Sequence, residues 1–72
     1  SAATASPADD PRAAAREQLR RADAAVSAFR AAVRADLRTH VARGGSLPAS
    51  VVDSFTAAIE RAQRELSEAL RR

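Results

Sequence analysis

Large apolar residues recur every three or four positions through two long segments of the chain, with polar and charged residues between them. In the first segment the repeat consists of Leu19, Ala22, Val26, Phe29, Val33 and Leu37. In the second it consists of Val52, Phe55, Ile59 and Leu66. Spacings of three and four residues place side chains on one face of an α-helix. The pattern therefore predicts an all-α chain with a first helix over about 10–43 and a second over about 48–71.

The ends of the first helix carry clear signals. Asp10 precedes Pro11, and this pair is typical of an N-cap followed by a proline in the first turn, where the missing N–H costs nothing. Gly44 follows the last periodic residues and can adopt the left-handed conformation that often ends a helix. The sequence thus predicts a stop at Gly44 and a turn over residues 44–47.

The start of the second helix is open between two alternatives. In the first, Ser46 caps the helix and Pro48 lies in its first turn. In the second, Ser50 forms a capping box with Asp53. Both place the start between Leu47 and Ser50.

The two apolar faces favour an antiparallel, coiled-coil-like hairpin over residues 10–72, preceded by a disordered segment or linker over residues 1–9. A hairpin leaves one side of each apolar face in water, and a core this small rarely supplies more than about 3–5 kcal/mol. With no cysteine and one histidine, neither disulfides nor a structural metal is expected to compensate. We therefore expect two hairpins to pair into a four-helix bundle, most simply a homodimer, with a helical partner protein as the alternative.

All twelve basic residues are arginine, and the net charge is +3. Six of them fall within one arc of about 80° on the first helix, beside its apolar face. This arginine ridge consists of Arg12, Arg16, Arg20, Arg30, Arg34 and Arg38. In one interpretation the ridge is a solvated flank, and the aliphatic parts of the arginine side chains cover the edge of the core. In the other it is a contact surface for phosphates or an acidic protein. In the second helix the charges allow i,i+4 pairs such as Glu60–Arg64.

No set of residues indicates catalysis. His40 has no neighbouring set of metal ligands and no nucleophile, and it is interpreted as a capping or interface histidine. The sequence predicts no enzyme activity, no cofactor and no metal. No apolar run approaches the roughly 20 residues of a membrane span. The expected location is the cytoplasm, with an exported mature chain as the open alternative.

The predicted hairpin is similar in outline to the helical-hairpin secretion substrates of actinobacteria, although their turn carries a Trp-x-Gly signature where this chain has Arg43-Gly44-Gly45-Ser46. It also resembles, in architecture only, the docking and dimerisation elements of large bacterial assembly-line enzymes. The residues favour a docking or dimerisation module that acts through its apolar face. The alternatives are a small basic nucleic-acid-binding regulatory protein that uses the arginine ridge, and a non-catalytic accessory subunit of an enzyme complex.

Overall fold

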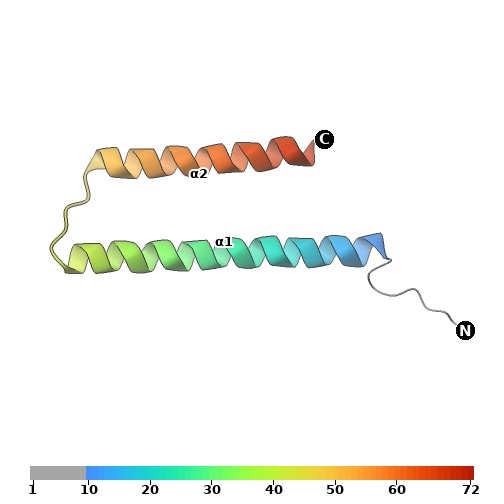
Figure 1. The fold of residues 1–72 in the computed structure, drawn as a ribbon, viewed down its shortest axis with the longest axis horizontal. Coiled ribbons are helices and arrows are strands. Elements are labelled where there is room, and N and C mark those ends of the chain that lie inside the picture. The colour runs from blue at the N-terminus through green and yellow to red at the C-terminus, as the bar shows by residue number, and fades with distance from the viewer. Residues whose placement is uncertain (1–9) are drawn as a thin grey trace, which may run out of the picture. The chain divides into compact units, whose positions relative to one another are not determined.

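The computed structural model describes residues 10–72. This part of the chain consists of two α-helices, α1 (Pro11–Ala42) and α2 (Ala49–Leu70), and contains no strand (Figure 1). The prediction of an all-α chain with two helices is confirmed. The helices begin and end within one residue of the predicted bounds. The predicted disordered segment or linker over residues 1–9 lies outside the described residues.

Asp10 starts α1 by satisfying backbone groups that the first turn leaves without partners. Its Oδ1 accepts a hydrogen bond from the backbone N–H of Arg12 at 2.9 Å. Its carbonyl oxygen accepts the N–H of Ala14, also at 2.9 Å. Pro11 is the first helical residue and has no N–H to satisfy. The predicted N-cap is confirmed.

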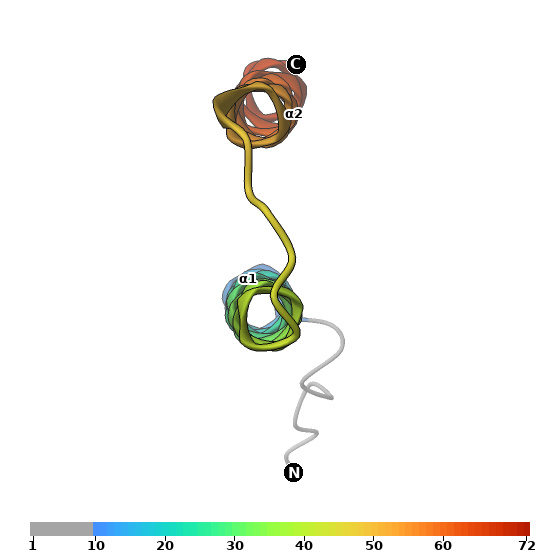
Figure 2. The same cartoon turned by 90° about the vertical axis from the view of Figure 1, so that its left-hand side faces the viewer.

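Gly44 ends α1 in the left-handed conformation, with φ of 82°. The N–H of Gly44 donates to the carbonyl of Val41, and the N–H of Gly45 donates to the carbonyl of His40, both at 2.9 Å. These two bonds form a Schellman motif, which satisfies the last carbonyls of the helix. The predicted stop is confirmed. The connecting segment over residues 43–48 then runs to α2 without regular helix (Figures 1 and 2).

α2 begins at Ala49, between Leu47 and Ser50, but neither of the two predicted caps forms. The N-cap is Pro48, with φ of −67° and ψ of 153°, and no side chain makes a capping hydrogen bond. The carbonyl of Pro48 accepts the N–H groups of Val51 and Val52 at 3.1 and 3.4 Å. Ser46 cannot cap because the turn places it two residues before the N-cap, while Ser50 already lies inside the helix.

The chain divides into two structural units between Thr39 and His40, so the end of α1, the turn and α2 belong to one unit.

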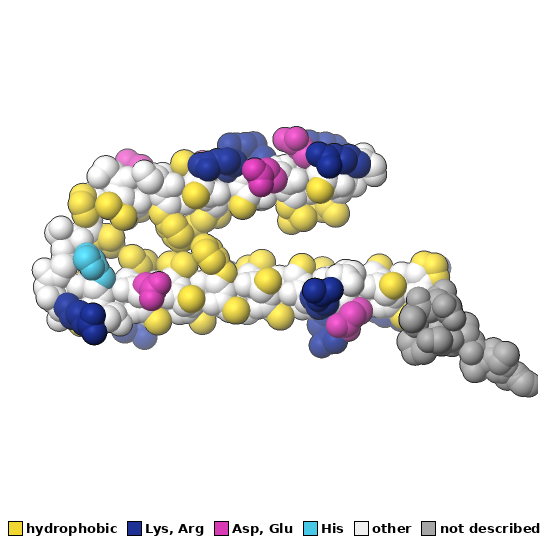
Figure 3. Space-filling model, viewed as in Figure 1, with side chains coloured by type: hydrophobic (Ala, Val, Ile, Leu, Met, Phe, Trp, Pro, Cys, Tyr) yellow, Lys and Arg dark blue, Asp and Glu magenta, His cyan; other side chains and the backbone are white. Residues whose placement is uncertain are grey.

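No side chain among residues 10–72 is buried. Apart from Val33, the large hydrophobic side chains range in exposed fraction from 38% at Phe55 to 76% at Leu70. Ala13, Val33, Gly45 and Ser67 are the least exposed of the described residues. Along α2, most hydrophobic side chains gather on one side of the helix and most charged ones on the opposite side (Figure 3). The apolar side chains of both helices are thus accessible to solvent.

The N-cap gives a test of how α1 begins. We expect Asp10→Ala to lower the free energy of unfolding by about 1 kcal/mol, because the N–H of Arg12 loses its acceptor. Urea unfolding followed by circular dichroism at fixed protein concentration measures this change. Asp10→Asn keeps a capping oxygen and should recover most of the loss. If Asn proves as costly as Ala, the carboxylate acts through its charge and not as a cap.

Candidate interaction surface

The predicted interface residues form one exposed apolar stripe on each helix. The α1 stripe consists of Leu19, Ala22, Val26, Phe29, Val33 and Leu37, and the α2 stripe of Val52, Phe55, Ile59 and Leu66. All of these residues are exposed except Val33, which is half-buried. On α1 the exposed fraction is 70% at Leu19 and 40% at Leu37. It rises from 38% at Phe55 to 58% at Leu66 on α2.

Four exposed large hydrophobic residues lie outside the predicted interface, namely Val41, Leu47, Val51 and Leu70. Val51 is 53% exposed at the start of α2, and Leu47 is 41% exposed in the connecting segment. Helical periodicity could not identify Leu47, because that residue does not lie in a helix. The apolar surface therefore extends past the stripes into the turn region.

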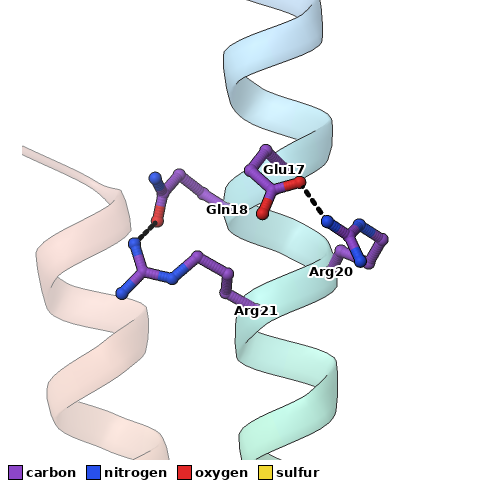
Figure 4. A network of polar contacts seen from close by, with 4 residues as sticks. All are labelled: Glu17, Gln18, Arg20 and Arg21. Carbon is purple, nitrogen blue, oxygen red and sulfur yellow. Dashed lines mark hydrogen bonds and ion pairs between the residues drawn. The ribbon is translucent and has the colours of Figure 1, made fainter.

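The arginine ridge lies entirely on α1, and all six side chains are exposed. One of them is paired: Arg20 forms an ion pair with Glu17, one turn earlier (Figure 4). Both side chains of this pair are exposed, so it contributes little stability. Beside it, Nη1 of Arg21 donates to Oε1 of Gln18 at 3.1 Å (Figure 4). Within residues 10–72, the other five arginines of the ridge form no ion pair.

The charges of α2 do not pair within the helix. None of the i,i+4 spacings that the sequence offers, such as Glu60–Arg64, closes into an ion pair in the described chain. The side-chain hydrogen bond within α2 runs instead from Nε2 of Gln63 to Oγ of Ser67 at 2.8 Å. An exposed ion pair is little more stable than two separately hydrated charges. The helix therefore loses little stability when these pairs do not form.

His40 closes the turn that follows α1. Its Nε2 lies 2.6 Å from the carbonyl oxygen of Ser46. A carbonyl oxygen only accepts, so Nε2 carries the proton and donates. The ring lies against Gly45, where an added Cβ would come within 2.7 Å of Nδ1 and closer still to Cε1 and Nε2. The ring of His40 thus bonds the turn and does not cap a helix end, and Gly45 is required for the space that it leaves to the ring.

No group of three or more metal-ligating side chains occurs within residues 10–72. Neither of the two described helices has the length and apolarity needed to cross a membrane. Comparisons with protein-family models, with curated proteins and with solved structures give no match to this chain. The apolar stripes and the arginine ridge are thus the features from which a function can be argued.

The contact between His40 and Gly45 can be tested with a double-mutant cycle. Gly45→Ala should lower the free energy of unfolding by about 1–3 kcal/mol, because the new methyl group displaces the imidazole ring. In a His40→Ala background the same substitution should cost much less, which gives a coupling of at least about 0.5 kcal/mol. Urea unfolding at one protein concentration measures all four variants.

Gly44→Ala is the matched control for this cycle. A Cβ at Gly44 has nothing within 4 Å, and the cost arises from its positive φ of 82°. That backbone strain of about 1–2 kcal/mol should be the same with or without His40. Equal costs of Gly45→Ala in both backgrounds would show that the ring does not occupy this space in solution.

Proposed function

We propose that this chain is a protein–protein interaction module that acts through the apolar stripes of α1 and α2. In this arrangement α1 and α2 form an antiparallel hairpin, and two copies of the hairpin pair into a four-helix bundle. No catalytic step, cofactor or metal is assigned to the chain. The role is to hold proteins together by packing helices.

The observation that carries this proposal is the exposure of the stripes. Complete burial of a Val, Leu, Ile or Phe side chain gains about 1.5–3 kcal/mol, and this gain is incomplete for every large member of both stripes. Contiguous apolar surface on a small chain commonly marks a site where another protein binds. The stripes are also long and periodic, as helix–helix packing requires.

A second copy of the chain is the occupant that we favour. Both helices carry apolar stripes with heptad spacing. The stripes of a second copy therefore match those of the first, and the two copies can pack around a two-fold axis. A four-helix bundle covers each stripe from both sides, which a single pair of helices cannot do. The chain also has no cysteine with which to stabilise a small core by other means.

The two other classes of function have weaker support. A nucleic-acid-binding protein would use the arginine ridge, but the chain has no Tyr or Trp and its two Phe residues belong to the apolar stripes. An accessory subunit of an enzyme complex would use the same stripes as the proposed module. It differs in the partner, which would be a heterologous helical protein.

Sedimentation equilibrium over a wide concentration range, with circular dichroism on the same samples, tests the proposed function. We expect a helical dimer whose helicity falls when dilution dissociates it, because assembly stabilises the folded chain by mass action. A fully helical monomer at every concentration would refute self-association. A poorly helical monomer would assign the stripes to a different partner.

A charge placed in the α2 stripe should disrupt the assembly. Ile59→Glu removes the free energy of about 1.5–3 kcal/mol that each copy gains by burying this side chain. A two-fold dimer contains the change twice, so its dissociation constant should rise at least about a hundredfold. Ala57→Glu is the matched control, since it adds the same charge two residues away, on the opposite side of α2. Equal effects of both substitutions in sedimentation equilibrium would contradict packing through the stripe.

A further inference from the structure

The net charge of this chain is confined to one stretch of its sequence. Residues 28–48 contain four arginines and one acid, Asp36. The residues before this stretch contain four arginines and four acids, and so do the residues after it. The whole charge of +3 therefore belongs to the second half of α1 and the turn.

Three arginines of the ridge lie in this stretch, namely Arg30, Arg34 and Arg38. All three are exposed, and none forms an ion pair with any of the described residues. Asp36 cannot neutralise them along the helix, because it lies at least about 120° round the axis from each. These guanidinium groups are therefore available to an acidic ligand.

A second copy of the chain supplies too few carboxylates to be that ligand. On α2, every acidic residue lies about 90° or more from the middle of the apolar stripe. These residues are Asp53, Glu60, Glu65 and Glu68. A helix that packs through its α2 stripe thus brings at most one carboxylate, that of Glu65, to the flank of the contact. One carboxylate cannot neutralise three arginines, so most of this charge stays unneutralised in such an assembly.

We propose that Arg30, Arg34 and Arg38 form a docking surface for an acidic helix of another protein. The three arginines follow one another at about 6 Å along α1, and carboxylates four residues apart on a partner helix have the same spacing. Each guanidinium fork matches the geometry of one carboxylate. This surface goes beyond the proposed self-association and does not depend on it.

The surroundings of the three arginines suit a protein helix better than a nucleic acid. The α1 stripe borders them on one side, and the small exposed residues Ala31 and Ala35 border them on the other. Small residues allow close approach of a partner helix. Nucleic-acid binders of high affinity neutralise roughly 6–10 phosphates, and stacking of bases requires aromatic side chains. Three arginines without an aromatic neighbour in the ridge meet neither requirement.

Binding of a labelled model helix to the full chain tests this proposal. The probe is an alanine-based peptide of about 20 residues, roughly 30 Å long, with glutamate at every fourth position. Fluorescence anisotropy at low ionic strength should show binding of this peptide and none of the same peptide with glutamine. The triple variant Arg30→Gln/Arg34→Gln/Arg38→Gln should weaken binding by about tenfold or more, because three ion pairs are lost.

The triple variant Arg61→Gln/Arg64→Gln/Arg71→Gln is the matched control. It removes an equal number of charges from α2 and its C-cap, and glutamine has nearly the helix propensity of arginine, so both variants should stay helical by circular dichroism. The control should bind the glutamate peptide within about twofold of the unchanged protein. Equal losses in both variants would assign binding to net charge alone and overturn the proposal.

Two further results distinguish a docking surface for an acidic helix from a nucleic-acid-binding surface and from a surface without a ligand. A single-stranded DNA of equal charge that binds more tightly than the glutamate peptide, and depends on the same three arginines, would overturn the proposal in favour of nucleic acid. Failure of the glutamate peptide to bind would overturn it as well. Sedimentation equilibrium keeps the two proposals apart, because a monomeric chain that binds the peptide through the ridge would refute self-association and leave the docking surface standing.

Discussion

The fold of this chain depends on covering two apolar stripes that its own described residues leave in contact with water. Isolated helices draw only marginal stability from backbone hydrogen bonds, because nucleation is costly and propagation gains little per residue. Most helix stability in proteins comes from packing an apolar face. With no buried side chain within residues 10–72, that contribution has to come from packing beyond the individual helix. Under the proposed self-association, folding and binding form one linked equilibrium.

The elements that the sequence predicted well are those determined by neighbouring residues. Asp10 and Pro11 start α1, and the carboxylate reaches an N–H only two residues ahead. Gly44 ends α1 because a residue without Cβ adopts a φ of 82° at no steric cost. In both cases the partners lie within one turn of the chain. Periodicity was equally informative about the stripes, since it depends on spacing alone.

The start of α2 and the role of His40 depend on contacts that no short pattern describes. The imidazole of His40 reaches a carbonyl six residues later, and this bond engages the backbone of Ser46 outside the helix. Pro48 then becomes the N-cap although it has no side-chain acceptor. The preferences of Ser46 and Ser50 for capping are worth about 1 kcal/mol at most positions, so the geometry of a turn can override them. Spacing likewise could not show which charges pair, because exposed pairs differ little in energy from hydrated ions.

The two proposed contact surfaces of α1 depend on different interactions, namely apolar burial at the stripe and charge at the ridge, so their effects can be separated. Burial of the apolar stripe is insensitive to moderate salt, whereas contacts to the exposed arginines weaken once the Debye length falls to about 8 Å at physiological ionic strength. Apolar burial supplies affinity, while exposed charges mainly set the choice of partner and the rate of encounter. The ridge lies directly beside the α1 stripe. A partner helix that packs on the stripe and carries acidic residues on its flank would therefore gain both apolar burial and ion pairs. A helix with arginines in the same place would be repelled, so under the two proposals the position of the charge limits which helices α1 can bind.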